Sequence, residues 1–167
     1  FFLNYLQELM ERLPLFNNDN LPLYGTVGMA SLHLLLCMKM SMQFRVKFVK
    51  IAENYNANDT ENIPMKESNK FKINERTQLN IAEYSGVLIA LLLYIQTQIN
   101  RKNIKLTKQA KISIYLTVIG SYLFAIGFLN VKTPSQTNII KFIGAISRYT
   151  GFAGLIYYLF KLAKSQQ

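Results

Sequence analysis

The chain has 167 residues, half of them hydrophobic, and a formal net charge of +10 at pH 7. This length accommodates one domain with a substantial core and is short for two. The one cysteine, Cys37, excludes an internal disulfide and a cysteine-based metal site, and the one histidine excludes a histidine cluster around a metal. We therefore expect no bound metal.

The net charge does not indicate a nucleic-acid-binding protein. The basic residues of the chain do not form a stripe along one element but lie mostly in the segments that flank apolar runs. Flanking charge of this kind is ordinary for membrane spans, where it meets anionic lipid headgroups. Membrane lipids are thus the expected partner, and nucleic acid is not.

Residues 1–16, FFLNYLQELMERLPLF, predict a short amphipathic helix that lies in the membrane interface and stops at Pro14. Apolar side chains recur there at helical spacing: Phe2, Leu3, Leu6, Leu9, Met10 and Leu13. The segment lacks the order of regions that defines a signal peptide.

Four apolar runs, at about 21–44, 79–99, 112–131 and 139–160, are almost free of acidic residues. A bilayer core about 30 Å thick needs roughly 20 apolar residues in a helix, and each run meets that length. The sequence therefore predicts an all-α fold, an integral membrane four-helix bundle that forms a single domain over 1–167. Basic residues on the two sides nearly balance, so charge does not assign the orientation in the membrane.

Polar residues interrupt and connect these runs. His33 is interpreted either as a neutral imidazole bonded within the bundle or as a proton relay, and Lys39 as snorkelling or paired with an acid. The stretch 45–78 is charged and asparagine-rich, and residues 44–73, FRVKFVKIAENYNANDTENIPMKESNKFKI, predict a long loop that is too polar to be embedded in the membrane.

The second run begins with a row of polar side chains on one helical face, namely Arg76, Asn80, Glu83, Tyr84 and Tyr94. A cation, an amide and a carboxylate in a row suit a zwitterionic, peptide-like ligand with a carboxylate and an ammonium group. The alternative is that these groups satisfy one another and polar partners on other helices, in which case they serve stability.

The stretch ERTQLNIAEY closely resembles the signature of the MAPEG superfamily, the membrane-associated proteins of eicosanoid and glutathione metabolism. In that signature the second membrane helix carries Arg, three residues, Asn, two residues and Glu-Tyr, here Arg76, Asn80, Glu83 and Tyr84. The proline that usually follows is replaced by Gly86. The resemblance covers about 140 residues, and the loop after the first span is most similar to the microsomal glutathione transferase 3 branch.

The resemblance implies a four-helix bundle that forms a homotrimer and holds glutathione between neighbouring subunits. The residues that would contact glutathione are Arg76, Asn80, Glu83 and Tyr84. A basic residue near the end of the first helix would help, with Arg45 as the first candidate and Lys47 as the second. The implied activity is conjugation of glutathione to lipophilic electrophiles or reduction of lipid hydroperoxides, in the endoplasmic reticulum or a mitochondrial membrane. Such an enzyme must stabilise the thiolate, which is the nucleophile.

The end of the third run departs from the family pattern. Catalytic relatives have tyrosines and an arginine there, whereas this sequence has Phe124, Ile126 and Phe128, with Lys132 as the nearest cation. Tyr122 and Arg148 are the candidate catalytic replacements. Arg148 either faces a subunit interface and stabilises the thiolate or, as the favoured alternative, pairs with Glu83 across the bundle.

Two classes of function follow. The retained row of polar residues favours a glutathione-dependent transferase or peroxidase. The lost groups of the third run favour a non-catalytic MAPEG-derived accessory or structural subunit of a larger membrane complex, such as a mitochondrial respiratory complex. A scaffold that presents lipids to another enzyme lies between the two.

Overall fold

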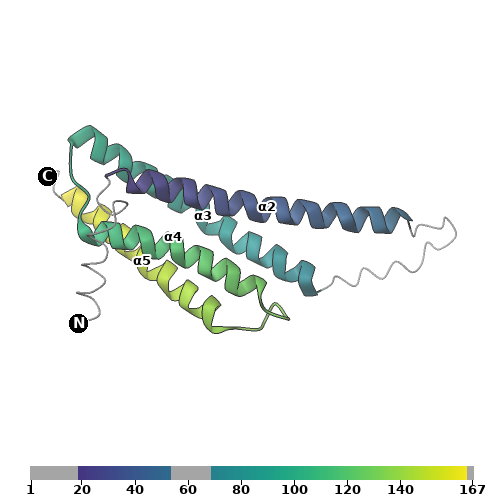
Figure 1. The fold of residues 1–167 in the computed structure, drawn as a ribbon. Helices are drawn as coiled ribbons and strands as arrows, with labels where there is room; N and C mark the ends of the chain where they lie inside the picture. The colour runs from purple at the N-terminus through teal and green to yellow at the C-terminus, as the bar shows by residue number, and fades with distance from the viewer. Residues whose placement is uncertain (1–18, 54–68, 165–167) are drawn as a thin grey trace.

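The computed structural model describes residues 19–53 and 69–164, and these form four helices in up-and-down order (Figure 1). Helix α2 is Leu21–Glu53, α3 is Asn69–Lys102, α4 is Lys108–Leu129 and α5 is Ile139–Lys164. The described part of the chain contains no strand. The interfacial helix predicted over 1–16 lies outside the described residues.

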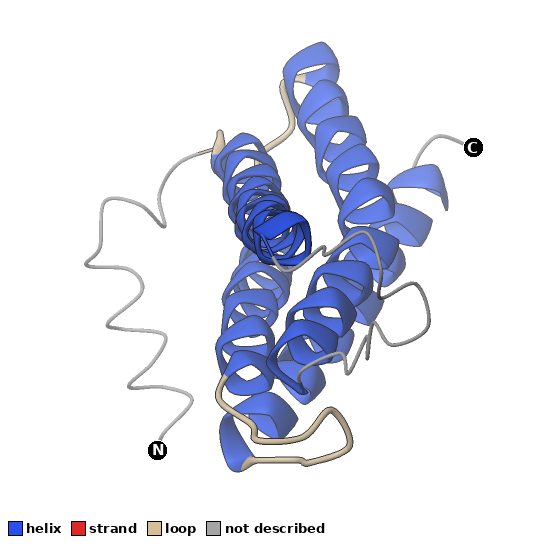
Figure 2. Ribbon diagram, turned by 90° about the vertical axis from the view of Figure 1, so that its right-hand side faces the viewer, coloured by secondary structure: helices blue, strands red, loops and turns tan. Residues whose placement is uncertain are grey.

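All four helices are long and apolar enough to cross a membrane, as the four apolar runs predicted. A segment in the bilayer core must satisfy its backbone hydrogen bonds internally, and a helix does so within one segment. Together the four helices indicate an integral membrane protein. The connection between α3 and α4 and the connection between α4 and α5 lie at opposite ends of the bundle, and they appear at the top and the bottom of Figure 2.

The prediction of a polar loop over the whole of 44–73 is wrong. Helix α2 continues to Glu53, and α3 begins at Asn69. Neither extension contains glycine or proline, so nothing in these segments breaks the helix before the turn-forming residues in between. An edge-to-face contact between Phe44 and Phe71, with ring centroids 5.1 Å apart, joins the two helices at this level.

The short connections are closed by polar side chains. After α3, Asn103 adopts a left-handed conformation with φ of 50°, and the N–H of Ile104 donates to the carbonyl of Ile99. Thr107 then caps α4, since its side chain accepts a hydrogen bond from the N–H of Ala110. Asn138 accepts from the N–H of Lys141 at the start of α5 and donates to the carbonyl of Gly127.

Glycines bring α4 and α5 into the closest contact in the bundle. A Cβ at Gly120 would lie 2.5 Å from the backbone nitrogen of Arg148, and one at Gly151 would lie 2.6 Å from the carbonyl oxygen of Ser113. Gly144 meets the backbone of α4 in the same way. Small residues at such positions let membrane helices approach closely, so the backbones of α4 and α5 pack directly on each other.

The core is apolar and involves all four helices. Leu88, Leu92 and Ile95 of α3 are buried with Met29 of α2 and Leu155 of α5 in one cluster. A second cluster includes Leu32, Leu36, Ile81, Phe124 and Phe128. The side of α3 that faces these clusters is apolar and differs from the side of its polar row, so core packing turns the polar row outward.

Candidate functional site

The polar row of α3 forms one outward-facing strip on the bundle. The side chains of Arg76 and Glu83 are exposed, and those of Asn80 and Tyr84 are half-buried. The amide of Asn80 donates to the carbonyl of Arg76 at 3.1 Å, which leaves its side-chain oxygen available as an acceptor. We call Arg76, Asn80, Glu83 and Tyr84 the α3 strip. Tyr94, predicted on the same face, is also exposed, 50% of its surface being accessible.

The face of α3 that packs against the core is apolar. Ile81, Leu88 and Leu92 are at most 1% exposed and belong to the core, whereas Leu79 is 50% exposed. The α3 strip therefore owes its position to burial of the apolar face. The helix contributes no buried carboxylate, because Glu83 is exposed and Glu75 is half-buried.

Arg148 is the buried cation nearest to the α3 strip in the described part of the chain. Its side chain is 3% exposed, and its guanidinium carbon lies 4.6 Å from the ring centroid of Tyr84, 4.3 Å from that of Phe124 and 4.8 Å from that of Tyr149. Contacts of this geometry are cation–π interactions. The predicted ion pair with Glu83 does not form between these described residues, because the guanidinium is enclosed by aromatic rings.

Two phenols connect Arg148 to the surface. Nη2 of Arg148 donates to the hydroxyl of Tyr149 at 3.0 Å, and the hydroxyls of Tyr149 and Tyr84 lie 3.5 Å apart. The two rings meet edge to face, with centroids 5.8 Å apart. Tyr149 is 48% exposed, so this pair of hydroxyls lies at the outer surface beside Glu83. The buried guanidinium therefore acts on the α3 strip both through its contact with the ring of Tyr84 and through the two tyrosine hydroxyls.

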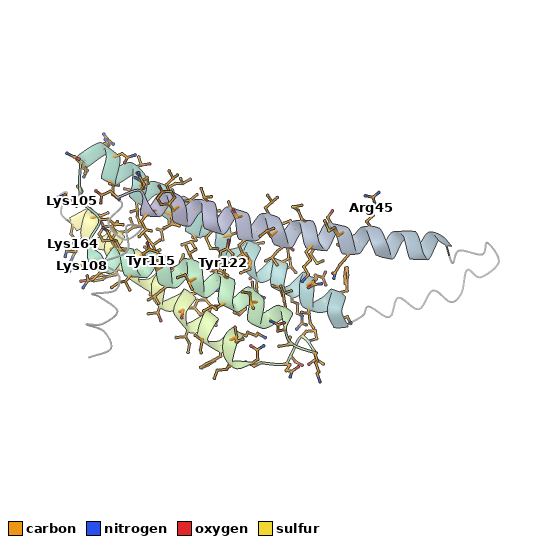
Figure 3. All side chains as sticks on the ribbon, viewed as in Figure 1. Arg45, Lys105, Lys108, Tyr115, Tyr122 and Lys164 are labelled. Atoms are coloured by element: carbon orange, nitrogen blue, oxygen red, sulfur yellow. The ribbon has the colours of Figure 1, made fainter. Side chains whose placement is uncertain are left out.

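Tyr122, the other candidate catalytic residue, is engaged elsewhere. Its hydroxyl donates to the carbonyl of Gly28 at 2.9 Å and so joins α4 to α2 (Figure 3). Phe124 and Phe128 are buried in the core, while Ile126 is exposed. This end of α4 thus directs its phenylalanine side chains inward.

The helper residue suggested for the first helix is not brought to the α3 strip within one chain. Arg45 is exposed on α2, and its side chain points away from the other helices (Figure 3). Nothing is described of the side chain of Lys47. Lys141 of α5 is instead close enough to Arg76 for the two charges to repel each other, and its ammonium lies 4.0 Å from the ring centroid of Phe128.

The polar residues of α2 lie between α2 and α3 or at the surface. Nε2 of His33 is 3.5 Å from the sulfur of Cys37, to which the amide of Gln78 donates at 3.6 Å. Lys39 is exposed, which agrees with a lysine that snorkels. His33 therefore has a partner on its own helix and lies apart from the α3 strip.

Sequence reasoning missed Tyr149 and Lys141 as members of the site. Both lie on α5, and only the packing of α5 beside α3 brings them to the strip. Tyr149 directly follows Arg148 in the chain, yet adjacent residues on a helix point in different directions, so the sequence carried no signal for their hydrogen bond.

In comparisons with known proteins, no family model matches the chain, and neither does any curated protein or solved structure.

Proposed function

We propose that this chain is a MAPEG-like integral membrane protein that binds glutathione on the α3 strip, between itself and an adjoining subunit. Its activity would be that of a glutathione-dependent transferase or peroxidase acting on lipophilic electrophiles or lipid hydroperoxides. The observation that supports this best is the α3 strip itself, in which a guanidinium, an amide oxygen and a carboxylate are exposed in a row.

Each group in the strip suits one part of the tripeptide. The guanidinium of Arg76, with Lys141 beside it, would bind a carboxylate, and the free oxygen of Asn80 would accept from a peptide N–H. The carboxylate of Glu83 would bind the ammonium group. Arg76 and Glu83 are seven residues apart, about 10 Å along a helix, which matches an extended tripeptide.

The exposure of these charges also favours an interface. An ionised side chain in a membrane span is costly when it faces lipid, and such residues usually face protein or a polar cavity. Glu83 lies well inside α3 and has no ion pair among the described residues. A second subunit over the α3 strip, in a homotrimer if the assembly is family-like, would remove it from lipid and enclose the ligand.

Glutathione binding to the purified full-length chain in detergent or nanodiscs tests the proposal. We expect saturable binding that the Arg76→Ala substitution weakens at least tenfold, because a charge-assisted hydrogen bond to a carboxylate contributes about 1.5–3 kcal/mol. Arg101→Ala is the matched control, since Arg101 is exposed at the other end of the same helix. Equal affinities for the two variants, or no saturable binding by the wild type, would contradict the proposal.

A non-catalytic role in a larger assembly is the second candidate. It is favoured by the inward-facing aromatic residues of α4 and by the hydrogen bond that engages Tyr122. In that role the α3 strip would bind polar side chains of another membrane subunit, for example in a mitochondrial complex. Stoichiometric co-purification with other chains from native membranes, without glutathione turnover, is the expected result for an accessory subunit.

A further inference from the structure

The buried guanidinium of Arg148 has hydrogen-bonding groups that nothing in the described chain satisfies. Its Nε and Nη1 atoms are buried without a partner, and Nη2 donates to Tyr149. Unpaired buried donors are costly, and the aromatic rings around this cation compensate only in part. In the described chain its one hydrogen bond goes to the hydroxyl of Tyr149, beside its contacts with the three rings.

The order of donors follows from this arrangement. The hydroxyl oxygen of Tyr149 accepts from Arg148, so its own hydrogen is free to point to the oxygen of Tyr84 at 3.5 Å. The hydroxyl hydrogen of Tyr84 then has no acceptor in the described chain and can point outward along the α3 strip. Hydrogen bonds in a chain polarise one another, so a cation at one end makes the last hydroxyl a stronger donor.

We propose that Tyr84 donates this hydrogen bond to the sulfur of bound glutathione and stabilises its thiolate, with Tyr149 and Arg148 as positioning residues on α5. The inference rests on the proposed glutathione site and adds the thiolate-stabilising group that α4 does not supply. No bond to the protein forms: the S–H proton leaves to water, and the thiolate accepts from Tyr84.

Charge around the hydroxyls favours an anion once the ammonium group of the ligand is bound. Two charged groups act on them electrostatically, Arg148 from α5 and Glu83 from α3, while α4 contributes the uncharged ring of Phe124. Glu83 alone would repel a thiolate. In the proposed complex the ligand's ammonium neutralises that carboxylate, which leaves the guanidinium as the dominant charge.

The test is a pH titration of the thiolate in the bound tripeptide, followed by its ultraviolet absorption in the full-length protein. S-methylglutathione, which cannot form a thiolate, provides the blank and a separate measure of binding. Tyr149→Phe keeps the ring beside Arg148 but removes the hydroxyl that connects Arg148 to Tyr84. Tyr157→Phe is the matched control, because Tyr157 is an exposed tyrosine on the same helix.

We expect Tyr149→Phe to lower the thiolate fraction about threefold at a pH below the thiol's apparent pKa, and Tyr84→Phe to lower it roughly tenfold. S-methylglutathione should bind Tyr149→Phe as it binds the wild type, and Tyr157→Phe should match the wild type throughout. An unchanged thiolate fraction in Tyr149→Phe overturns the inference while leaving the proposed function intact. If Tyr149→Phe loses S-methylglutathione binding by the same factor as it loses thiolate, the inference is also overturned, since the hydroxyl of Tyr149 would then only hold the ligand.

Failure of the proposed function gives a different result. If wild-type protein binds neither glutathione nor S-methylglutathione, the site itself is refuted and the inference falls with it. Binding of both ligands with a thiol that titrates as it does in water would refute only the inference.

Discussion

Adding one methyl group at Gly144 tests the close packing of α4 and α5. In Gly144→Ala the new Cβ would lie 2.7 Å from the Cα of Phe124 and 2.8 Å from the carbonyl carbon of Leu123. Carbon atoms at optimal separation are about 3.5–4.0 Å apart. The two helices must therefore separate by roughly 1 Å, because the atoms that clash belong to the backbone and cannot rotate away.

The expected cost follows from that displacement. Overpacking a well-packed core costs about 1–3 kcal/mol, and we expect the upper half of this range because Gly120 and Gly151 pack in the same interface and lose contacts together. Replacing glycine by alanine also lowers the entropy of the unfolded chain, which is worth about 0.4–1 kcal/mol in the opposite direction.

Gly86→Ala is the control that separates the two effects. Gly86 lies in α3 and is exposed, and a methyl group added there would have no other atom within 4 Å beyond its own helix backbone and chain neighbours. Both variants share the entropy gain, so their difference in unfolding free energy measures packing alone. Reversible unfolding in mixed detergent micelles supplies both values. If Gly144→Ala is as stable as Gly86→Ala, the close approach of α4 and α5 is refuted.

Two smaller perturbations test single hydrogen bonds by the same measurement. Thr107→Ala removes the cap of α4 and should cost about 1 kcal/mol, whereas Thr97→Ala should be near neutral because Thr97 lies in a helix interior and bonds only to its own helix. A cost at Thr97 equal to that at Thr107 would contradict the capping role. Tyr122→Phe removes the bond to the carbonyl of Gly28 and should cost about 0.5–1.5 kcal/mol, with glutathione affinity unchanged. Loss of glutathione affinity in that variant would show that Tyr122 belongs to the site after all.

The spans were predictable because they depend on local composition. A bilayer admits a single polypeptide segment essentially only as a helix, so hydropathy alone located all four. Helical periodicity likewise placed Arg76, Asn80, Glu83 and Tyr84 on one face, and the structure has them on one side of α3. The helix ends beyond the apolar runs were harder to predict, since hydropathy marks where a helix can meet lipid and not where the helix stops.

Contacts between helices required the tertiary structure. Sequence reasoning favoured an ion pair between Arg148 and Glu83, which opposite charge alone would suggest. The glycines of α4 and α5 instead set the rotation and depth of α5, and that placement encloses Arg148 between Tyr84, Phe124 and Tyr149. The amino-acid sequence by itself therefore determined four membrane-length helices and the polar face of one of them. Only the packing decided which side chains of α5 meet that face, because the rotation of a helix about its axis depends on the shape of its neighbours.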